Sequence, residues 1–77
     1  MKLEIISPSE IMFSGDVESV TLPGVEGSFT VLKNHASLIS VLNPGKVFYK
    51  GIEGEVELEI KGGIADVDSN KIEVCVY

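Results

Sequence analysis

Two side chains in this sequence are of the kinds that most often act as base and nucleophile near neutral pH: His35 and Cys75. His35 lies in a polar segment, Lys33 to Ala36, where a single imidazole is more typical of a hydrogen-bonding or packing group. Cys75 alternates with apolar residues in a terminal strand, and its acidic surroundings indicate an inert thiol near a sheet edge. Because a triad needs a base beside its nucleophile, we predict no catalytic residue and no enzyme activity.

Acidic and glycine-rich segments could support other chemistry. Glu55, Glu57 and Glu59 could form the paired carboxylates of a hydrolase, but acids at alternate positions are typical of the solvated face of a strand. Asp66 to Asn70 is similar to the start of a calcium loop, yet the glycine and glutamate needed further on are missing. Gly62-Gly63 precedes a strand pattern and not a phosphate-binding helix. With one histidine and one cysteine, zinc spacing is also absent, so we expect no metal and no cofactor.

These side chains must be positioned by one small domain, residues 1–77, with a net charge of −6. That sign argues against nucleic acid as a partner and against binding to anionic lipid. No apolar run approaches the roughly 20 residues of a membrane helix, so direct membrane insertion is not expected. A single cysteine excludes an internal disulfide and fits a reducing compartment. A core this thin leaves little room for a small-molecule substrate and favours stabilisation by a partner protein.

Alternation of apolar and polar residues predicts strands and no helix. The clearest case is Glu55 to Ile60, which places three apolar side chains on one face and three glutamates on the other. A final hairpin is predicted from Ile64 to Asp68 and from Ile72 onward, joined by a turn rich in Asp, Ser and Asn. Earlier strands are expected at Leu3 to Ile6, Ile11 to Phe13, Val17 to Leu22, Ser28 to Val31, Leu38 to Leu42 and Lys46 to Lys50.

Turn signals separate these strands, and we predict structural turns at Gly15, Pro23, Gly24, Pro44, Gly45, Gly62 and Gly63. The pattern is typical of an all-β fold, a small antiparallel β-sandwich or flattened barrel of about eight to ten short strands. We exclude a parallel sheet because no crossover of sufficient length separates two strands. The predicted core consists of Ile5, Val20, Leu22, Phe29, Val31, Leu38, Val41, Val47, Val56, Leu58, Ile60, Val67, Ile72 and Val74.

An ordered set of short motifs runs from about Leu3 to the last residue. In order and spacing it resembles the amino-terminal domain of the epsilon subunit of bacterial F-type ATP synthase, called delta in mitochondria. The motifs are Phe13-Ser14-Gly15 with Val17-Glu18, Thr21-Leu22-Pro23-Gly24 with Glu26-Gly27, Phe29, Val31-Leu32, Asn34-His35-Ala36, Leu38-Ile39, Leu42, Pro44-Gly45, and Gly62-Gly63 with Asn70 and Val74.

The resemblance implies a non-catalytic subunit of the central stalk, which links the gamma subunit to the c-ring and helps couple ion-driven rotation to ATP synthesis. It implies that Ser7 and His35 lie close to gamma, and that Glu26, Gly27 and Ser28 form the loop that contacts the c-ring. An acidic rim facing basic loops of the ring would steer docking and set its register. The implied location is peripheral, on the cytoplasmic side of the bacterial inner membrane, within the ATP synthase complex.

Typical members of that family continue into a hairpin of two helices that inhibits ATP hydrolysis. This sequence stops at Tyr77, after the last strand pattern, so we do not expect helix-based inhibition from it. An alternative reading is a carrier domain of the biotinyl or lipoyl type, which presents a lysine at the tip of a hairpin. Lys71, just after Asp68-Ser69-Asn70, is the nearest match to such a lysine.

Overall fold

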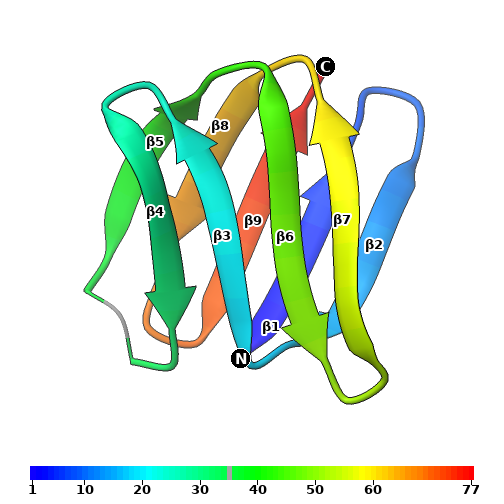
Figure 1. Cartoon of the computed structure of the whole chain (residues 1–77), viewed down its shortest axis with the longest axis vertical. Helices are drawn as coiled ribbons and strands as arrows, with labels where there is room; N and C mark the ends of the chain where they lie inside the picture. The colour runs from blue at the N-terminus through cyan, green and yellow to red at the C-terminus, as the bar shows by residue number, and fades with distance from the viewer. Residues whose placement is uncertain (35) are drawn as a thin grey trace.

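Figure 1 shows the computed structural model of the chain, which describes residues 1–34 and 36–77. The all-β prediction is confirmed, and no helix in these residues is long and apolar enough to cross a membrane. Nine strands lie in the described residues: β1 (Lys2–Ile6), β2 (Ile11–Asp16), β3 (Ser19–Gly24), β4 (Gly27–Leu32), β5 (Leu38–Leu42), β6 (Gly45–Gly51), β7 (Gly54–Ile60), β8 (Gly63–Val67) and β9 (Lys71–Val76).

The strands form one curled sheet whose two halves face each other as layers (Figure 1). Hydrogen-bonded neighbours follow the order β2-β1-β9-β8-β5-β3-β6-β7, and β4 pairs with β3. The front layer contains β4, β3, β6 and β7, and the back layer contains β5, β8, β9, β1 and β2. The molecule measures 18 Å along its shortest axis, so the layers enclose one thickness of interdigitated side chains.

One pair of neighbouring strands is parallel in a sheet whose other described pairs are antiparallel, so the exclusion of a parallel sheet holds but the reason given for it does not. β1 and β9 run in the same direction, with Leu3 beside Ile72 and Ile5 beside Val74. The reason, that no crossover of sufficient length separates two strands, was wrong because it considered only connections between strands close in sequence. The connection between β1 and β9 is the rest of the domain, which is far longer than a parallel crossover requires. The other strand pairs in the described residues are antiparallel.

The core between the layers contains most of the predicted residues. The side chains confirmed as buried are Ile5, Val20, Leu22, Val31, Val47, Ile60, Val67, Ile72 and Val74. Phe29, Leu38 and Leu58 are half-buried and pack against this core. The prediction missed six further buried side chains, namely Leu3, Val17, Leu42, Tyr49, Ala65 and Val76.

Two predicted core residues, Val41 and Val56, are exposed, with 52% and 45% of their surface accessible. In β5, Leu42 is buried and the alternation of the strand therefore directs its neighbour Val41 outward. Val56 lies opposite the buried Tyr49, on the core-facing side of β7. Because β7 is an edge strand, the layers do not cover Val56 fully.

The structure differs from the predicted turns at several glycines and prolines. Pro44 and Gly62 lie in connections between strands, as predicted. In contrast, β2 continues through Gly15, which pairs with Leu3. The remaining predicted turn residues lie at the ends of strands, because the connections between these strands are shorter than the sequence pattern indicates; they are Pro23, Gly24, Gly45 and Gly63.

Candidate functional site

The hairpin between β3 and β4 brings the three predicted c-ring residues together at one tip. A two-residue turn, Val25 and Glu26, connects the strands, and Gly24 pairs with Gly27 across it. Gly27 has a backbone φ of +126°, which residues other than glycine rarely adopt. At Gly24, an added Cβ would lie 2.8 Å from the carbonyl oxygen of Gly27. The tight tip therefore requires glycine at both positions, for different reasons.

Two backbone hydrogen bonds fix this hairpin to the next strand of the back layer. The amide of Val25 donates to the carbonyl oxygen of Val41 at 2.9 Å, and the amide of Asn43 donates to that of Pro23 at 2.8 Å. Glu26 and Ser28 remain exposed. The tip is thus an exposed acidic turn on a well-supported base, which suits a contact surface.

Ser7, one of the two residues predicted to face gamma, begins the turn between β1 and β2. Its amide donates to the carbonyl oxygen of Glu10 at 2.9 Å, and its hydroxyl accepts from the amide of Glu10 at 3.2 Å. This turn and the tip at Glu26 lie at the same end of the sandwich, the upper end in Figure 1. The local hydrogen bonds fix the turn, so Ser7 is presented in a defined position.

The other residue predicted to face gamma, His35, lies outside the described residues. The strands on either side of it are β4, which ends at Leu32, and β5, which begins at Leu38. These two strand ends lie at the lower end of the sandwich in Figure 1, opposite the turn at Ser7. The described residues therefore do not bring Ser7 close to the last residue of β4 or the first residue of β5.

The outer faces of the two layers differ in chemistry, which sequence reasoning missed. The front layer presents polar contacts, among them the Thr21 and Thr30 hydroxyls at 2.9 Å and the Lys46 to Glu57 ion pair at 2.8 Å. The hydrogen bond and charge of Glu57 raise the pKa of Lys46. The back layer instead exposes apolar side chains on β5 and β8, including Ile39, Val41 and Ile64. The sequence contains a signal for this face, because Val41 and Leu42 are adjacent apolar residues in one strand. Neighbouring residues of a strand point to opposite faces, so one of the two must point outward.

Within residues 1–34 and 36–77, the side chains considered for chemistry are not brought together into a reactive site. Among the described residues, no group of three or more His, Cys, Asp or Glu side chains could hold a metal ion. Glu55, Glu57 and Glu59 are exposed, as expected for a solvated strand face. Cys75 is exposed on β9, but β9 lies between β1 and β8, which corrects the placement near an edge.

The segment that is similar to a calcium loop forms the turn between β8 and β9. The Asp68 carboxylate accepts a hydrogen bond from the amide of Ser69 at 2.8 Å and one from the hydroxyl of Ser37 at 3.0 Å. These two bonds, the Ser69 bond more strongly, lower the pKa of Asp68. The carboxylate therefore joins this turn to the segment before β5.

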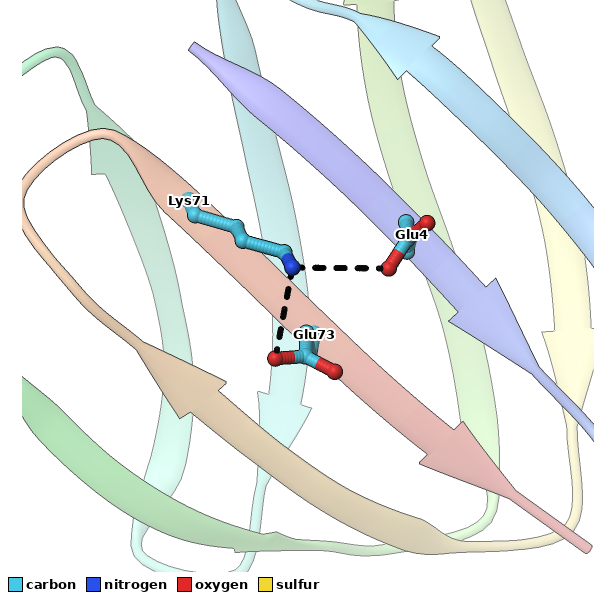
Figure 2. A network of polar contacts seen from close by, with 3 residues as sticks. All are labelled: Glu4, Lys71 and Glu73. Atoms are coloured by element: carbon cyan, nitrogen blue, oxygen red, sulfur yellow. Dashed lines mark ion pairs between the residues drawn. The ribbon is translucent and has the colours of Figure 1, made fainter.

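Lys71 is not at a hairpin tip, which removes support for the carrier-domain alternative. It is the first residue of β9, and its ammonium group lies 3.8 Å from the Glu4 carboxylate and 3.7 Å from that of Glu73. Figure 2 shows Lys71 between these two glutamates on the outer face of β1 and β9. A lysine held over a sheet face does not have the reach that a swinging arm requires.

Comparisons with known proteins agree on one family. The family model described as "ATP synthase, Delta/Epsilon chain, beta-sandwich domain" matches residues 1–77. The ATP synthase epsilon chain of Wolinella succinogenes is 45% identical over 75 residues, which cover 96% of this chain and 57% of that protein. The chain thus spans a little over half the length of this curated relative.

Solved structures share the fold. A chain of the Euglena gracilis mitochondrial ATP synthase, in a cryo-EM structure of OSCP, F1 and c-ring, superposes with a TM-score of 0.89 and 23% identity over 96% of this chain and 48% of that chain. A chain in a cryo-EM structure of the Tetrahymena thermophila mitochondrial ATP synthase central stalk and c-ring superposes with a TM-score of 0.82 and 20% identity. The match covers 97% of this chain and 61% of that chain.

Proposed function

Because the chain belongs to the delta/epsilon chain β-sandwich domain family of ATP synthase, we propose that it is a non-catalytic component of the rotor. In this role it links the gamma subunit to the c-ring and supports coupling of ion-driven rotation to ATP synthesis. The match of the family model over residues 1–77 carries the proposal. The implied location is peripheral to the membrane, on the cytoplasmic side of a bacterial inner membrane, as part of the ATP synthase complex.

The c-ring contact is assigned to Glu26, Gly27 and Ser28. Support comes from the form of the tip, which is exposed at one end of the sandwich and is tied to β5 by hydrogen bonds of the Val25 and Asn43 amides. A tip that transmits load must resist bending, and these bonds supply that resistance. Glu26 places a negative charge at the tip, where it would attract basic loops of a ring and set the register of docking.

The gamma contact is assigned to Ser7 and His35. Support for Ser7 comes from its fixed turn and from its position at the same end of the sandwich as the c-ring tip. An interface that bears torque must be broad and partly apolar, since a small interface would dissociate. The exposed Ile64 of the back layer supplies surface of that kind near Ser7, because Ile6, which precedes Ser7, lies beside Cys75, and Cys75 lies opposite Ile64.

Cysteine cross-linking in a purified complex of this chain with gamma and the c-ring tests both assignments. In a Cys75→Ser background, Ser28→Cys should cross-link to the c-ring and Ser7→Cys to gamma. The matched control is Ile52→Cys, in the fully exposed turn between β6 and β7 at the opposite end of the sandwich. A c-ring cross-link from residue 52 with none from residue 28 would contradict the assignment. Failure of the chain to enter the complex at all would contradict the rotor role itself.

A further inference from the structure

The sandwich is open on one side, where the two ends of the sheet do not pair with each other. β2 and β7 are the first and last strands in the order of hydrogen-bonded neighbours, and both lie on the right in Figure 1. Each therefore has one row of backbone amide and carbonyl groups that no other strand of the described residues pairs with. Another extended segment can form hydrogen bonds with such a row.

β7 is better suited than β2 to accept a strand. The register of β2 with β1 shifts between Ile5 and Ile6 and passes over Met12, and an irregularity of this kind protects an edge from pairing. β7 pairs with β6 from Gly54 to Ile60 without such a shift. It also contains none of the proline and lysine residues that commonly protect edges. The edge of β7 is thus long, regular and open.

A cavity of about 490 Å³ lies on this open side, beside the first half of β7. Its walls include Phe13 and Asp16 of β2, Tyr49 of β6 and Val56 of β7. Val56 lies on the core-facing side of its strand, yet 45% of its surface is exposed, whereas Tyr49 opposite it is buried. The front layer thus leaves part of its apolar face uncovered at β7. A strand beside β7 would cover Val56, and one of its apolar side chains would occupy the cavity.

The charges of β7 indicate which strand fits. Glu55, Glu57 and Glu59 alternate with the core-facing residues, and among these three glutamates the described residues contain one ion pair, from Glu57 to Lys46 at 2.8 Å. A second copy of this chain paired through β7 would set glutamates against glutamates, with a net charge of −6 on each molecule. A strand with lysines or arginines on the same face would instead place opposite charges side by side. The glutamates therefore protect the edge against self-association and leave it open to a basic strand.

We propose that the open edge of β7 binds an extended segment of a partner protein in which apolar and basic residues alternate. The segment adds a strand to the front layer and forms backbone hydrogen bonds with β7. Its basic side chains lie beside the three glutamates, and its apolar side chains cover Val56 and enter the cavity against Phe13. This inference goes beyond the proposed rotor role, because that role assigns no contact to the open side of the sandwich.

Fluorescence anisotropy with designed peptides tests the proposal. The probe is the heptapeptide Val-Lys-Phe-Lys-Phe-Lys-Val carrying fluorescein, N-methylated at its lysines so that only one of its edges can form a strand ladder. Because its sequence is the same in both directions, the lysines can lie beside the glutamates in a parallel or an antiparallel pair. We expect saturable binding to the chain. The same peptide N-methylated at every residue keeps the side chains but has no backbone donor, and it should not bind.

A substitution on β7 tests the position of the peptide. Val56→Lys should weaken binding at least tenfold, because a charged side chain on the core-facing side of an edge strand opposes pairing. The matched control is Leu32→Lys, which makes the same change of charge at an exposed apolar residue of β4, at the other edge of the front layer. It should bind the peptide as the unchanged chain does. Circular dichroism checks that both variants are folded.

Hydrogen exchange locates the peptide on the chain without any substitution. Binding should slow the exchange of backbone amides between Gly54 and Ile60 and leave those of β8 and β9 unchanged. Absence of saturable binding, protection of β8 or β9 in place of β7, or equal binding of the fully methylated peptide would overturn the proposal. Equal weakening by Val56→Lys and Leu32→Lys would also do so, as would dimerisation of the chain through β7 in sedimentation equilibrium without binding of the peptide.

Discussion

The rings of Phe13 and Tyr49 lie with their centroids 4.3 Å apart and their planes tilted by 37°. Phe13 belongs to β2, at the edge of the back layer, and Tyr49 to β6 in the front layer. The sheet does not close between β2 and β7, so this aromatic pair joins the two layers on their open side. Tilted pairs at this separation contribute beyond the apolar area that they bury.

Replacement of Phe13 by alanine should therefore lower the free energy of unfolding by about 2 to 3 kcal/mol, less than for a fully buried phenylalanine because Phe13 is only half-buried. Urea denaturation followed by circular dichroism measures the change. Phe13→Leu is the control, since it keeps apolar contact with Tyr49 but removes the ring, and it should cost less. An unchanged midpoint for Phe13→Ala would show that the open side is held by other contacts.

The hairpin tip should be sensitive to a side chain at Gly27. Gly27→Ala places a Cβ on a residue with a φ of +126°, and strain of this kind costs on the order of 1–3 kcal/mol. Gly51→Ala is the matched control, because its φ is not positive and the added Cβ would be in ordinary contact, 3.4 Å from the Asp16 carbonyl oxygen. Thermal unfolding of the two variants compares them. Equal melting temperatures would argue against a tip fixed by backbone conformation.

Asp68 should make stability depend on pH. Its hydrogen bonds from Ser69 and Ser37 lower its pKa in the folded chain, whereas an aspartate in an unfolded chain titrates near about 3.9. The unfolded state therefore takes up the proton first as pH falls. The stabilisation that the ionised Asp68 carboxylate gives the folded chain is complete above the pKa of the unfolded state. It is lost as pH falls through the folded pKa. Asp68→Asn should have a lower melting temperature than the unchanged chain at pH 6, and the difference should shrink toward pH 2.

Two valines should respond differently to the same truncation. Val74 is fully buried, so Val74→Ala should lower the free energy of unfolding by about 2 kcal/mol. Val41 is exposed on the outer face of β5, so Val41→Ala should change it by less than about 0.5 kcal/mol. Chemical denaturation of both variants measures the contrast. A large loss for Val41→Ala would mean that the outer face of β5 is covered when the chain is free in solution.

Local patterns in the sequence predicted the strands well because alternation and turn residues act over short distances. The pattern from Glu55 to Ile60 gave β7 with its glutamates outward, and the all-β class followed from many such segments. The same reasoning failed at Val41, because β5 is apolar on both faces and the pattern does not say which face is covered. The pairing of β1 with β9 could not be read locally, since it depends on which distant strands meet.

For the candidate site, the sequence identified the residues at the tip but not what supports them. Glu26, Gly27 and Ser28 were found through a resemblance, whereas the bonds from the Val25 and Asn43 amides follow from the path of β5 beside the hairpin. The line of exposed apolar side chains on the outer face of the back layer was missed for a related reason. Its members come from five strands, and only the register of all five brings Ile11 and Val41 into one line.

The position of β9 between β1 and β8 has a consequence for how the protein is made. During synthesis, β1 is made before the other strands of this domain, but one of its two neighbours, β9, is made after all of them. Until then β1 and β8 each have an unpaired edge, which is a template for association with other chains. The domain must therefore fold after translation of nearly all its residues, and a nascent chain stalled before Lys71 should be a target for chaperones and proteases.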